Sequence, residues 1–450
     1  MIGNIYKNII VIGGNAAGLA AANQIRRINK DLNIKVFESG NYISYGSCSL
    51  PHYISGTISN IDSILNYSVD YFLENKNIEI FLRHKAVLVN SFKKEVIFNT
   101  DYENGFSNPG KNIAFSYDRL VICSGASPSK LNIEGSDAKN VFTFRKVEDA
   151  INLRAFIETE DPKEAVIIGG GYIGLLLADS LNKRGIKITI VEVKEKILSE
   201  YEADVSDILY KELLNKGIKI FNNTKITKIN CNKITGKAHS VTLESSDTKN
   251  YEKNEIDTDL ILISAGISPN TNFVSGSFID LAKNGAIKVS ANQQTSHPNI
   301  YAAGDCCLVK NLVTKSYDYI PNASNAIKSG RIAGANAAGE QEIFIGSAGT
   351  KVDKIFGYEI AKTGIGLSEA LDYKFNALKI TDNFSSHVSA LPGSEKIYIS
   401  IIVDKNTRKL LGAQMIGKDG VGKRIDIFAA ALSCEMTVNE IYMIDTSYSP

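Results

Sequence analysis

Long apolar runs, an excess of charge of one sign and CxxC cysteine pairs are all missing from this sequence of 450 residues. No run reaches the length that crosses a bilayer, and residues 9–12 read as a strand, not a signal peptide, so we expect a cytoplasmic protein without a membrane partner. Lys and Arg total 50 and Asp and Glu total 49, which gives no reason to expect nucleic acid as a partner. The cysteines form no CxxC pair, so we expect neither a metal site nor a disulfide framework; they stand at positions 48, 123, 231, 306, 307 and 434.

What is present is an internal repeat. Two segments share one pattern: an apolar strand, a glycine-rich turn, a helix and a second strand that ends at an acid. In the first copy these elements are residues 8–12, 13–18, 19–28 and 34–38. In the second copy they are residues 165–168, 169–174, 175–184 and 186–191, with the acid at 192. Two copies of one βαβ unit predict an α/β fold with two Rossmann-like dinucleotide-binding domains.

The glycines of each turn have physical tasks. One permits the tight turn, one lets the backbone reach a pyrophosphate, and one lets the helix pack closely on the strand. The second copy satisfies the GxGxxG pattern with Gly169, Gly171 and Gly174, whereas the first has Asn15 at the middle position. The phosphates would rest on the N-terminus of the helix, at the positive end of its dipole.

The acid after each second strand predicts how a ribose is bound. Glu38 and Glu192 can each accept hydrogen bonds from ribose hydroxyls. A carboxylate repels the 2′-phosphate of NADP, so Glu192 favours NADH over NADPH. Lys194 and Lys196 stand close by in the sequence and keep NADPH possible.

Later segments extend each copy. Apolar strands that end in small residues occur at 117–126 and 259–270, and a strand at 299–305 ends in Gly304 and Asp305. Asp305 could cap a following helix or bind the ribityl hydroxyls of a flavin, and the two roles are compatible. From about residue 349 no nucleotide turn appears, and we expect an α+β domain. Its predicted elements are strands at 397–403 and 409–416 and a helix at 425–434.

One cysteine stands apart from the rest. Cys48 precedes Pro51, which suits the first turn of a helix, so Cys48 is expected just before a helix N-terminus. That position lowers the pKa of a thiol and favours the reactive thiolate. The alternative is an inert, buried cysteine.

The order of these motifs resembles a known family. The turn at 13–18, the segment at 44–53, the strand at 117–126, the turn at 169–174 and residues 417–426 are similar to the single-cysteine branch of the FAD-dependent pyridine nucleotide–disulfide oxidoreductases. Within it the chain most resembles the coenzyme A-disulfide reductases; NADH oxidases, NADH peroxidases and polysulfide reductases are relatives.

The resemblance implies three domains in a homodimer. The FAD domain is expected at 1–145 and 270–340, interrupted by an NAD(P)-binding domain at 146–269 and followed by a C-terminal dimerisation domain at 341–450. Cys48 would be the redox-active cysteine and Tyr448 a catalytic tyrosine that enters the partner's site. Ile43 and Tyr53 occupy the places of a second cysteine in two-cysteine relatives, which excludes an internal disulfide.

The resemblance also implies the cofactor contacts. Those expected for FAD are Gly13, Gly14, Asn15, Ala16, Gly18, Glu38, Ser44, Val87, Ser124, Gly125, Gly304, Asp305 and Ala323. Those expected for NADH are Gly169, Gly171, Tyr172, Ile173, Gly174, Glu192 and Gly266. Tyr172 matches an aromatic gate over the flavin, and its alternative role is that of a core aromatic.

The substrate follows from a few positions. Gln24, Arg27 and Ser44 match coenzyme A contacts, although Arg27 could equally be a solvated helix residue. Ala16 stands where the NADH oxidases and peroxidases carry a histidine, which argues against oxygen or peroxide. We therefore predict reduction of a small disulfide or polysulfide, coenzyme A disulfide above all, by NADH. Alternatives are an NADH oxidase and a low-turnover flavin redox sensor; the sensor is suggested by Leu176 and Ala390, which replace a glutamate and a tyrosine of the family.

Overall fold

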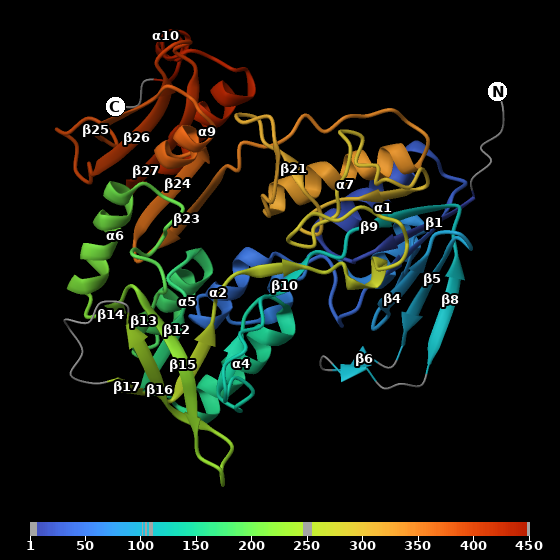
Figure 1. The fold of residues 1–450 in the computed structure, drawn as a ribbon, viewed down its shortest axis with the longest axis horizontal. Helices are drawn as coiled ribbons and strands as arrows, with labels where there is room; N and C mark the ends of the chain where they lie inside the picture. The colour runs from blue at the N-terminus through green and yellow to red at the C-terminus, as the bar shows by residue number, and fades with distance from the viewer. Residues whose placement is uncertain (1–6, 101, 104–105, 108–110, 246–253, 448–450) are drawn as a thin grey trace.

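The computed structural model describes residues 7–100, 102–103, 106–107, 111–245 and 254–447. Figure 1 shows three units, each built around a five-stranded sheet. The first and second units are α/β and the third carries an antiparallel sheet, so the predicted fold class is confirmed. In the part of the chain that is described, no helix is both long and apolar enough to cross a membrane.

The first unit has a parallel sheet in the order β20-β9-β1-β2-β3. Its strands are β1 (Asn8–Ile12), β2 (Asn33–Phe37), β3 (Glu79–Phe81), β9 (Arg119–Ile122) and β20 (Ile300–Ala302). A three-stranded antiparallel sheet accompanies it, made of β4 (Lys85–Asn90), β5 (Glu95–Asn99) and β8 (Asn112–Ser116). Because β20 comes from far along the chain, the first unit is discontinuous.

Two helices pack on each other over this sheet, α1 (Ala16–Ile28) and α7 (Ala323–Ala337). Small residues allow the close approach: a Cβ on Gly330 or Gly334 would collide with the backbone of Ala17 or Ala21. The crossing fixes the N-terminal ends of both helices relative to β1, which is where the first glycine turn lies.

The second unit repeats the first. Its parallel sheet has the equivalent order β11-β18-β12-β13-β14. These strands are β11 (Val141–Thr143), β12 (Glu164–Ile168), β13 (Lys187–Val191), β14 (Lys219–Phe221) and β18 (Leu260–Ile263). An antiparallel sheet again follows, of β15 (Thr224–Cys231), β16 (Ala238–Ser245) and β17 (Glu255–Asp257). The helices are α4 (Val147–Glu160), α5 (Tyr172–Asn182) and α6 (Ala203–Asn215). Strand β11 lies just before residue 145, the predicted end of the first FAD segment, yet belongs to this second sheet.

The third unit is an antiparallel sheet in the order β23-β24-β27-β26-β25. The strands are β23 (Lys351–Ile355), β24 (Tyr358–Gly364), β25 (Ala377–Ser385), β26 (Lys396–Asp404) and β27 (Leu410–Gly417). Its helices are α8 (Leu367–Asp372), α9 (Val421–Ser433) and α10 (Val438–Tyr442), and α9 packs on β24 and β27. The predicted strands at 397–403 and 409–416 and the helix at 425–434 are therefore present.

Short elements connect the units. Strands β10 (Ala126–Pro128) and β19 (Ile267–Pro269) pair antiparallel and join the first unit to the second. The remaining elements are the 3₁₀ helices η1 (Ser47–Ser49), η2 (Ile61–Ile64) and η3 (Asn272–Val274), the helices α2 (Leu50–Ile54) and α3 (Val69–Lys76), and the short strands β6 (Tyr102–Glu103), β7 (Phe106–Ser107), β21 (Val309–Lys310) and β22 (Tyr317–Asp318).

One apolar cluster joins all three units. Helix α2 of the first unit and α5 of the second lie near the centre of Figure 1, and β23 of the third packs on α5. The fully buried side chains of Leu50, Leu175 and Ile355, one from each unit, belong to the same cluster. We call this meeting point the junction; it places the segment of Cys48 beside the second glycine turn.

Candidate redox site

The first glycine turn lies between β1 and α1. Gly13 has φ +109°, which L side chains rarely adopt, and a Cβ on Gly18 would strike the carbonyl oxygen of Gly13. No side chain caps α1. Its first N–H groups and the positive end of its dipole are thus directed into the turn, an arrangement that suits a diphosphate.

Glu38 is fixed beside this turn. Its carboxylate oxygens accept hydrogen bonds from the backbone N–H groups of Gly14 (2.7 Å) and Gly40 (2.7 Å). The side chain is thereby held at the end of β2, where the dinucleotide fingerprint predicts a ribose.

The second turn is a geometric copy of the first. Gly169 has φ +106°, and the backbone N–H of Gly170 donates to the Glu192 carboxylate at 2.7 Å. Outside the turns the repeat continues: Ser44 and Leu198 both have positive φ, at 52° and 48°. Their N–H groups donate to the carbonyls of Gly14 (3.1 Å) and Gly170 (2.9 Å). The chain therefore contains two turns that fit a dinucleotide, one in each unit.

The lysines near Glu192 have partners of their own. The ammonium of Lys194 donates to the Ser199 hydroxyl at 2.9 Å, and that of Lys196 forms an ion pair with Asp207 at 2.7 Å. The preference for NADH over NADPH stays a prediction.

Asp305 does not cap a helix, which corrects one of its two predicted roles. The chain turns after Gly304, with the N–H of Cys307 donating to the Gly304 carbonyl, and the next α-helix is α7. The Asp305 carboxylate instead pairs with Arg145 at 2.5 Å. Arg145 precedes α4, so this ion pair links the first unit to the start of the second. The sequence prediction missed Arg145 because 160 positions separate it from Asp305.

Other predicted flavin contacts lie in several elements of the first unit. The Ser124 hydroxyl donates to the carbonyl of Asn270 at 2.6 Å, and Gly125 accepts from the Asn270 N–H. Ala323 is the first residue of α7. Val87 lies at an irregularity of β4 and is partly exposed. In the second unit, Ile173 is partly exposed at the start of α5 and Gly266 follows β18.

Cys48 is exposed in η1, and α2 follows with Pro51 in its first turn, as predicted. Cys48 is therefore not the buried cysteine of the alternative, and its reactivity stays a prediction. The expected fall in its pKa is wrong: partial burial raises the pKa of the Cys48 thiol and the Asp353 carboxylate adds to the rise, against smaller opposing effects of a backbone N–H and Arg145. Helix α2 has only five residues, so its dipole is weak.

Tyr172 is the first residue of α5 and points into the junction. Burial raises the pKa of its hydroxyl, and Asp353 and Cys48 contribute to the rise. The Lys351 ammonium lies 5.3 Å from the centroid of its ring. Tyr172 packs against the apolar cluster of the junction, and Leu176, one turn further along α5, is buried in it.

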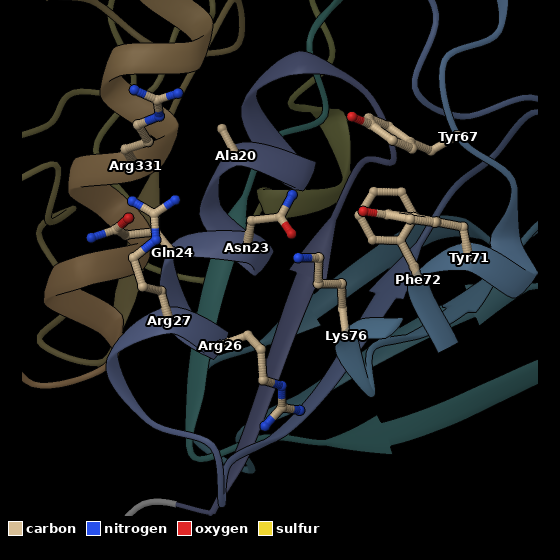
Figure 2. A pocket seen from close by; sticks show the side chains of 10 residues that line it. All are labelled: Ala20, Asn23, Gln24, Arg26, Arg27, Tyr67, Tyr71, Phe72, Lys76 and Arg331. Carbon is tan, nitrogen blue, oxygen red and sulfur yellow. The ribbon is translucent and has the colours of Figure 1, made fainter. Parts of the chain in front are cut away.

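A cavity of about 410 Å³ opens beside α1. Figure 2 shows Arg331 of α7 next to Gln24 and Arg27 of α1, with Tyr67 and Tyr71 on the opposite side. The predicted pair Gln24 and Arg27 does line one site. The complete lining is Ala20, Asn23, Gln24, Arg26, Arg27, Tyr67, Tyr71, Phe72, Lys76 and Arg331.

Ser44 connects this cavity to the cysteine segment. Its carbonyl accepts hydrogen bonds from the backbone N–H (2.8 Å) and side-chain amide (2.9 Å) of Asn66. Asn66 precedes Tyr67, which lines the cavity. Ser44 itself does not line it. The other predicted catalytic residue, Tyr448, lies outside the described residues.

Comparison with known proteins agrees with this geometry. Residues 7–330 match the family described as pyridine nucleotide-disulphide oxidoreductase, and residues 354–450 match its dimerisation domain. An NAD(P)H coenzyme A polysulfide/persulfide reductase of Pyrococcus horikoshii is 31% identical over 99% of this chain and 95% of its own. A coenzyme A disulfide reductase of Staphylococcus haemolyticus is 29% identical over 99% and 96%. The structure of an NAD-dependent persulfide reductase from A. fulgidus superimposes with a TM-score of 0.91 at 29% identity, covering 98% of this chain and 80% of that one.

Two dinucleotide turns beside an exposed cysteine define a flavin- and nicotinamide-dependent oxidoreductase. The chain belongs to the pyridine nucleotide-disulphide oxidoreductase family. The predicted cofactors, FAD and NAD(P)H, are confirmed at the level of this family.

Proposed function

We propose that this protein uses NADH, and less well NADPH, to reduce the disulfide or polysulfide form of coenzyme A through Cys48. The observation that carries the proposal is the cavity beside α1. It combines aromatic rings with cationic side chains, and its lining contains no acid. Coenzyme A has matching parts, since a purine stacks on aromatic rings and its phosphates bind Arg and Lys.

The cations of the cavity are available for phosphates. Arg27, Lys76 and Arg331 show no ion pair within the described part of the chain. Arg26 differs, because its guanidinium donates to the backbone carbonyls of Lys30 and Asn77, and burial lowers its pKa. The rings of Tyr67 and Tyr71 stack on each other with centroids 4.6 Å apart, and both line the cavity. We therefore place the phosphates on Arg27, Lys76 and Arg331.

Hydrogen bonds tie the segment of Cys48 to the residues that lead into the cavity. The segment of Cys48 is tied to residues 64–67 through the N–H of Gly46, which donates to the Ile64 carbonyl, and through Ser44. A ligand whose nucleotide end occupies the cavity can thus direct a flexible arm that ends in sulfur along this segment to Cys48.

The chemistry on Cys48 is thiol–disulfide exchange. The thiolate attacks one sulfur of the substrate, a mixed disulfide forms on Cys48, and the other half leaves as a thiolate that takes up a proton. Bound FAD would supply the two electrons of NADH that cleave the mixed disulfide, which with one proton yields the second thiol and regenerates the Cys48 thiolate. The residues expected to hold FAD are Gly13, Gly14, Asn15, Ala16, Gly18, Glu38, Ser124 and Asp305, and those expected to hold NADH are Gly169, Gly171, Gly174 and Glu192.

The domain assignment follows from the same proposal. We assign the FAD domain to 1–145 and 270–340, except that β11 pairs in the sheet of the NAD(P) domain. The NAD(P) domain is assigned to 146–269 and the dimerisation domain to 341–450. We also propose a homodimer. Helix α10 supports it, since Tyr442 and Met443 are 87% and 77% exposed.

A charge-matched pair of variants tests the coenzyme A site. Arg27→Gln removes a cation from the cavity, and Lys30→Gln removes one outside it, a turn further along the chain. We expect Arg27→Gln to raise the KM for coenzyme A disulfide by about tenfold to 150-fold, because a charged hydrogen bond contributes about 1.5–3 kcal/mol. Lys30→Gln should leave that KM unchanged, and neither variant should affect a small disulfide without phosphates. Equal effects of both variants, or of Arg27→Gln on both substrates, would contradict the site.

A measurement of oxygen consumption separates the proposal from an NADH oxidase. With NADH and air but no disulfide, we expect slow oxygen uptake compared with anaerobic NADH oxidation in the presence of coenzyme A disulfide. Fast oxygen uptake with no response to the disulfide would favour the oxidase instead.

A further inference from the structure

The loop that follows the acid of the second glycine turn leads to the third unit. It runs from Glu192 to the start of α6 and packs on the turn, because the N–H of Leu198 donates to the Gly170 carbonyl at 2.9 Å. A Cβ on Gly170 would lie only 2.6 Å from the side chain of Ile197. Helix α6, which follows the loop, lies against the third unit (Figure 1). The position of this loop, residues 193–202, therefore affects the backbone of a turn that fits a dinucleotide.

Two lysines of the third unit hold Glu200 of this loop. Lys351 of β23 forms an ion pair with the Glu200 carboxylate at 2.5 Å, and the ammonium of Lys362 of β24 donates to the Glu200 backbone carbonyl at 2.9 Å. The two lysines are direct neighbours across the antiparallel pair of β23 and β24. Like charges in such a position repel each other. The lysine pair therefore favours an acid at this point of the loop, and Glu200 supplies it.

The same lysines lie beside two tyrosine rings of the second unit. The ammonium of Lys351 is 5.3 Å from the ring centroid of Tyr172 and 5.8 Å from that of Tyr201, and the ammonium of Lys362 is 5.7 Å from that of Tyr201. A cation within about 6 Å of a ring centroid is attracted to the ring. Tyr172 is the first residue of α5 and belongs to the turn, whereas Tyr201 belongs to the loop. Lys351 therefore interacts with the turn as well as with the loop that packs on it.

Further bonds keep the second unit attached to the third without this lysine pair. The N–H of Glu202 donates to the Gln414 side chain at 2.6 Å. At the start of α6, Lys379 forms an ion pair with Asp204 at 2.9 Å. Replacing one lysine of the pair should therefore shift the loop beside the turn without separating the two units.

We propose that Lys351 and Lys362 are positioning residues of the nicotinamide nucleotide site: from the third unit they fix Glu200 and the Tyr172 ring, and with them both sides of the second glycine turn. The inference rests on the proposed function only in placing NADH at this turn, and it is independent of the disulfide substrate. Its consequence is that the third unit, besides any role in dimerisation, sets the affinity for NADH.

Nucleotide binding to the FAD-loaded protein tests the proposal. NAD⁺ is titrated into the oxidised protein by calorimetry, and flavin reduction by NADH is followed anaerobically without any disulfide. We expect Lys351→Gln and Lys362→Met each to weaken NAD⁺ binding, and to raise the half-saturating NADH concentration, by about threefold to tenfold, the effect of losing one hydrogen bond. The limiting rate should change by less than about twofold, because the change falls on binding and not on the reacting atoms.

Three other variants make the test specific. Lys354→Gln removes an exposed cation on the opposite face of β23 and should match the wild type. Lys351→Arg keeps a cation beside Glu200 and should recover most of the NAD⁺ affinity. Glu200→Gln breaks the ion pair from the side of the second unit and leaves the third unit unchanged. Combined with Lys351→Gln, it should weaken binding no further than the worse single variant does, because both changes remove one interaction.

Hydrogen exchange provides a readout that does not depend on turnover. In the FAD-loaded protein without nucleotide, Lys362→Met should speed amide exchange in peptides that cover residues 169–174 and 196–202, and Lys354→Gln should not. NAD⁺ affinity that stays at the wild-type value in Lys351→Gln, Lys362→Met and Glu200→Gln would overturn the proposal. Failure of the wild type to reduce coenzyme A disulfide would refute the proposed substrate and leave this test intact.

Discussion

The two glycine turns allow a paired substitution that reveals which cofactor each one holds. A Cβ on Gly18 would strike the carbonyl oxygen of Gly13, and a Cβ on Gly174 would strike that of Gly169. The obstacle is backbone in both cases, so it cannot rotate away, and each helix must shift from its turn. Overpacking of this kind costs about 1–3 kcal/mol. If that cost falls on the phosphate site, ligand affinity drops by about fivefold to 150-fold.

The assay compares Gly18→Ala and Gly174→Ala. For Gly18→Ala we expect weaker FAD binding, measured as the FAD needed to reconstitute the visible absorbance of the protein. For Gly174→Ala we expect FAD retention with a KM for NADH raised by the factor above. Gly185→Ala is the control for a glycine substitution without a collision. Gly185 has φ +79°, so an added Cβ strains the backbone, but no atom lies near the Cβ position and the residue lies beyond the end of α5. If Gly174→Ala lost FAD and kept its KM for NADH, the assignment of the turns would be reversed.

Three further predictions follow from single groups. Because partial burial raises the pKa of the Cys48 thiol, alkylation of the free thiol should rise with pH with a midpoint above about 8.5, the usual thiol value; a midpoint below it would contradict this effect of burial. Glu192→Gln should raise kcat/KM for NADPH relative to NADH by about tenfold or more, because the carboxylate that faces the 2′-phosphate loses its charge, and an unchanged ratio of the two kcat/KM values would refute that placement. Gly330→Ala should lower the free energy of unfolding by about 1–3 kcal/mol by forcing α7 from Ala17 of α1, and an unchanged urea midpoint would contradict that helix crossing.

The sequence predicted the repeat well because its signals are local. The strand expected at 8–12 is β1, and both glycine turns lie where the motif placed them. The helices begin earlier than predicted: α1 at Ala16 and α5 at Tyr172. The first turn of each helix is part of the glycine motif, so its composition is that of a turn although its conformation is helical.

The residues that were missed are brought to the site by distant parts of the chain. Arg145 and Asp305 pair across 160 positions, and Lys76 and Arg331 reach the cavity from α3 and α7. Strand β23 shows why the order of apolar and polar residues does not by itself predict which face of a strand is buried. Apolar residues do not decide which face of this strand is buried, because Val352 and Ile355 lie on opposite faces. The structure buries Ile355 in the junction, and Asp353 lies on the same face.

The pKa of Cys48 could not be predicted from the sequence for a different reason. The motif correctly indicated a thiol before a helix with proline in its first turn. It could not indicate that this helix ends after five residues or that a carboxylate from the third unit stands nearby. Both features depend on the tertiary structure, and both disfavour the thiolate form of Cys48.

Cys48→Ser is the most direct test of the account. The variant is loaded with FAD, reduced anaerobically with one equivalent of NADH and then mixed with coenzyme A disulfide. We predict that NADH reduces the flavin of the variant as it does that of the wild type, and that the disulfide reoxidises only the wild type. Reoxidation of the Cys48→Ser variant at the rate of the wild type would show that electrons reach the substrate without this sulfur, and would contradict the account.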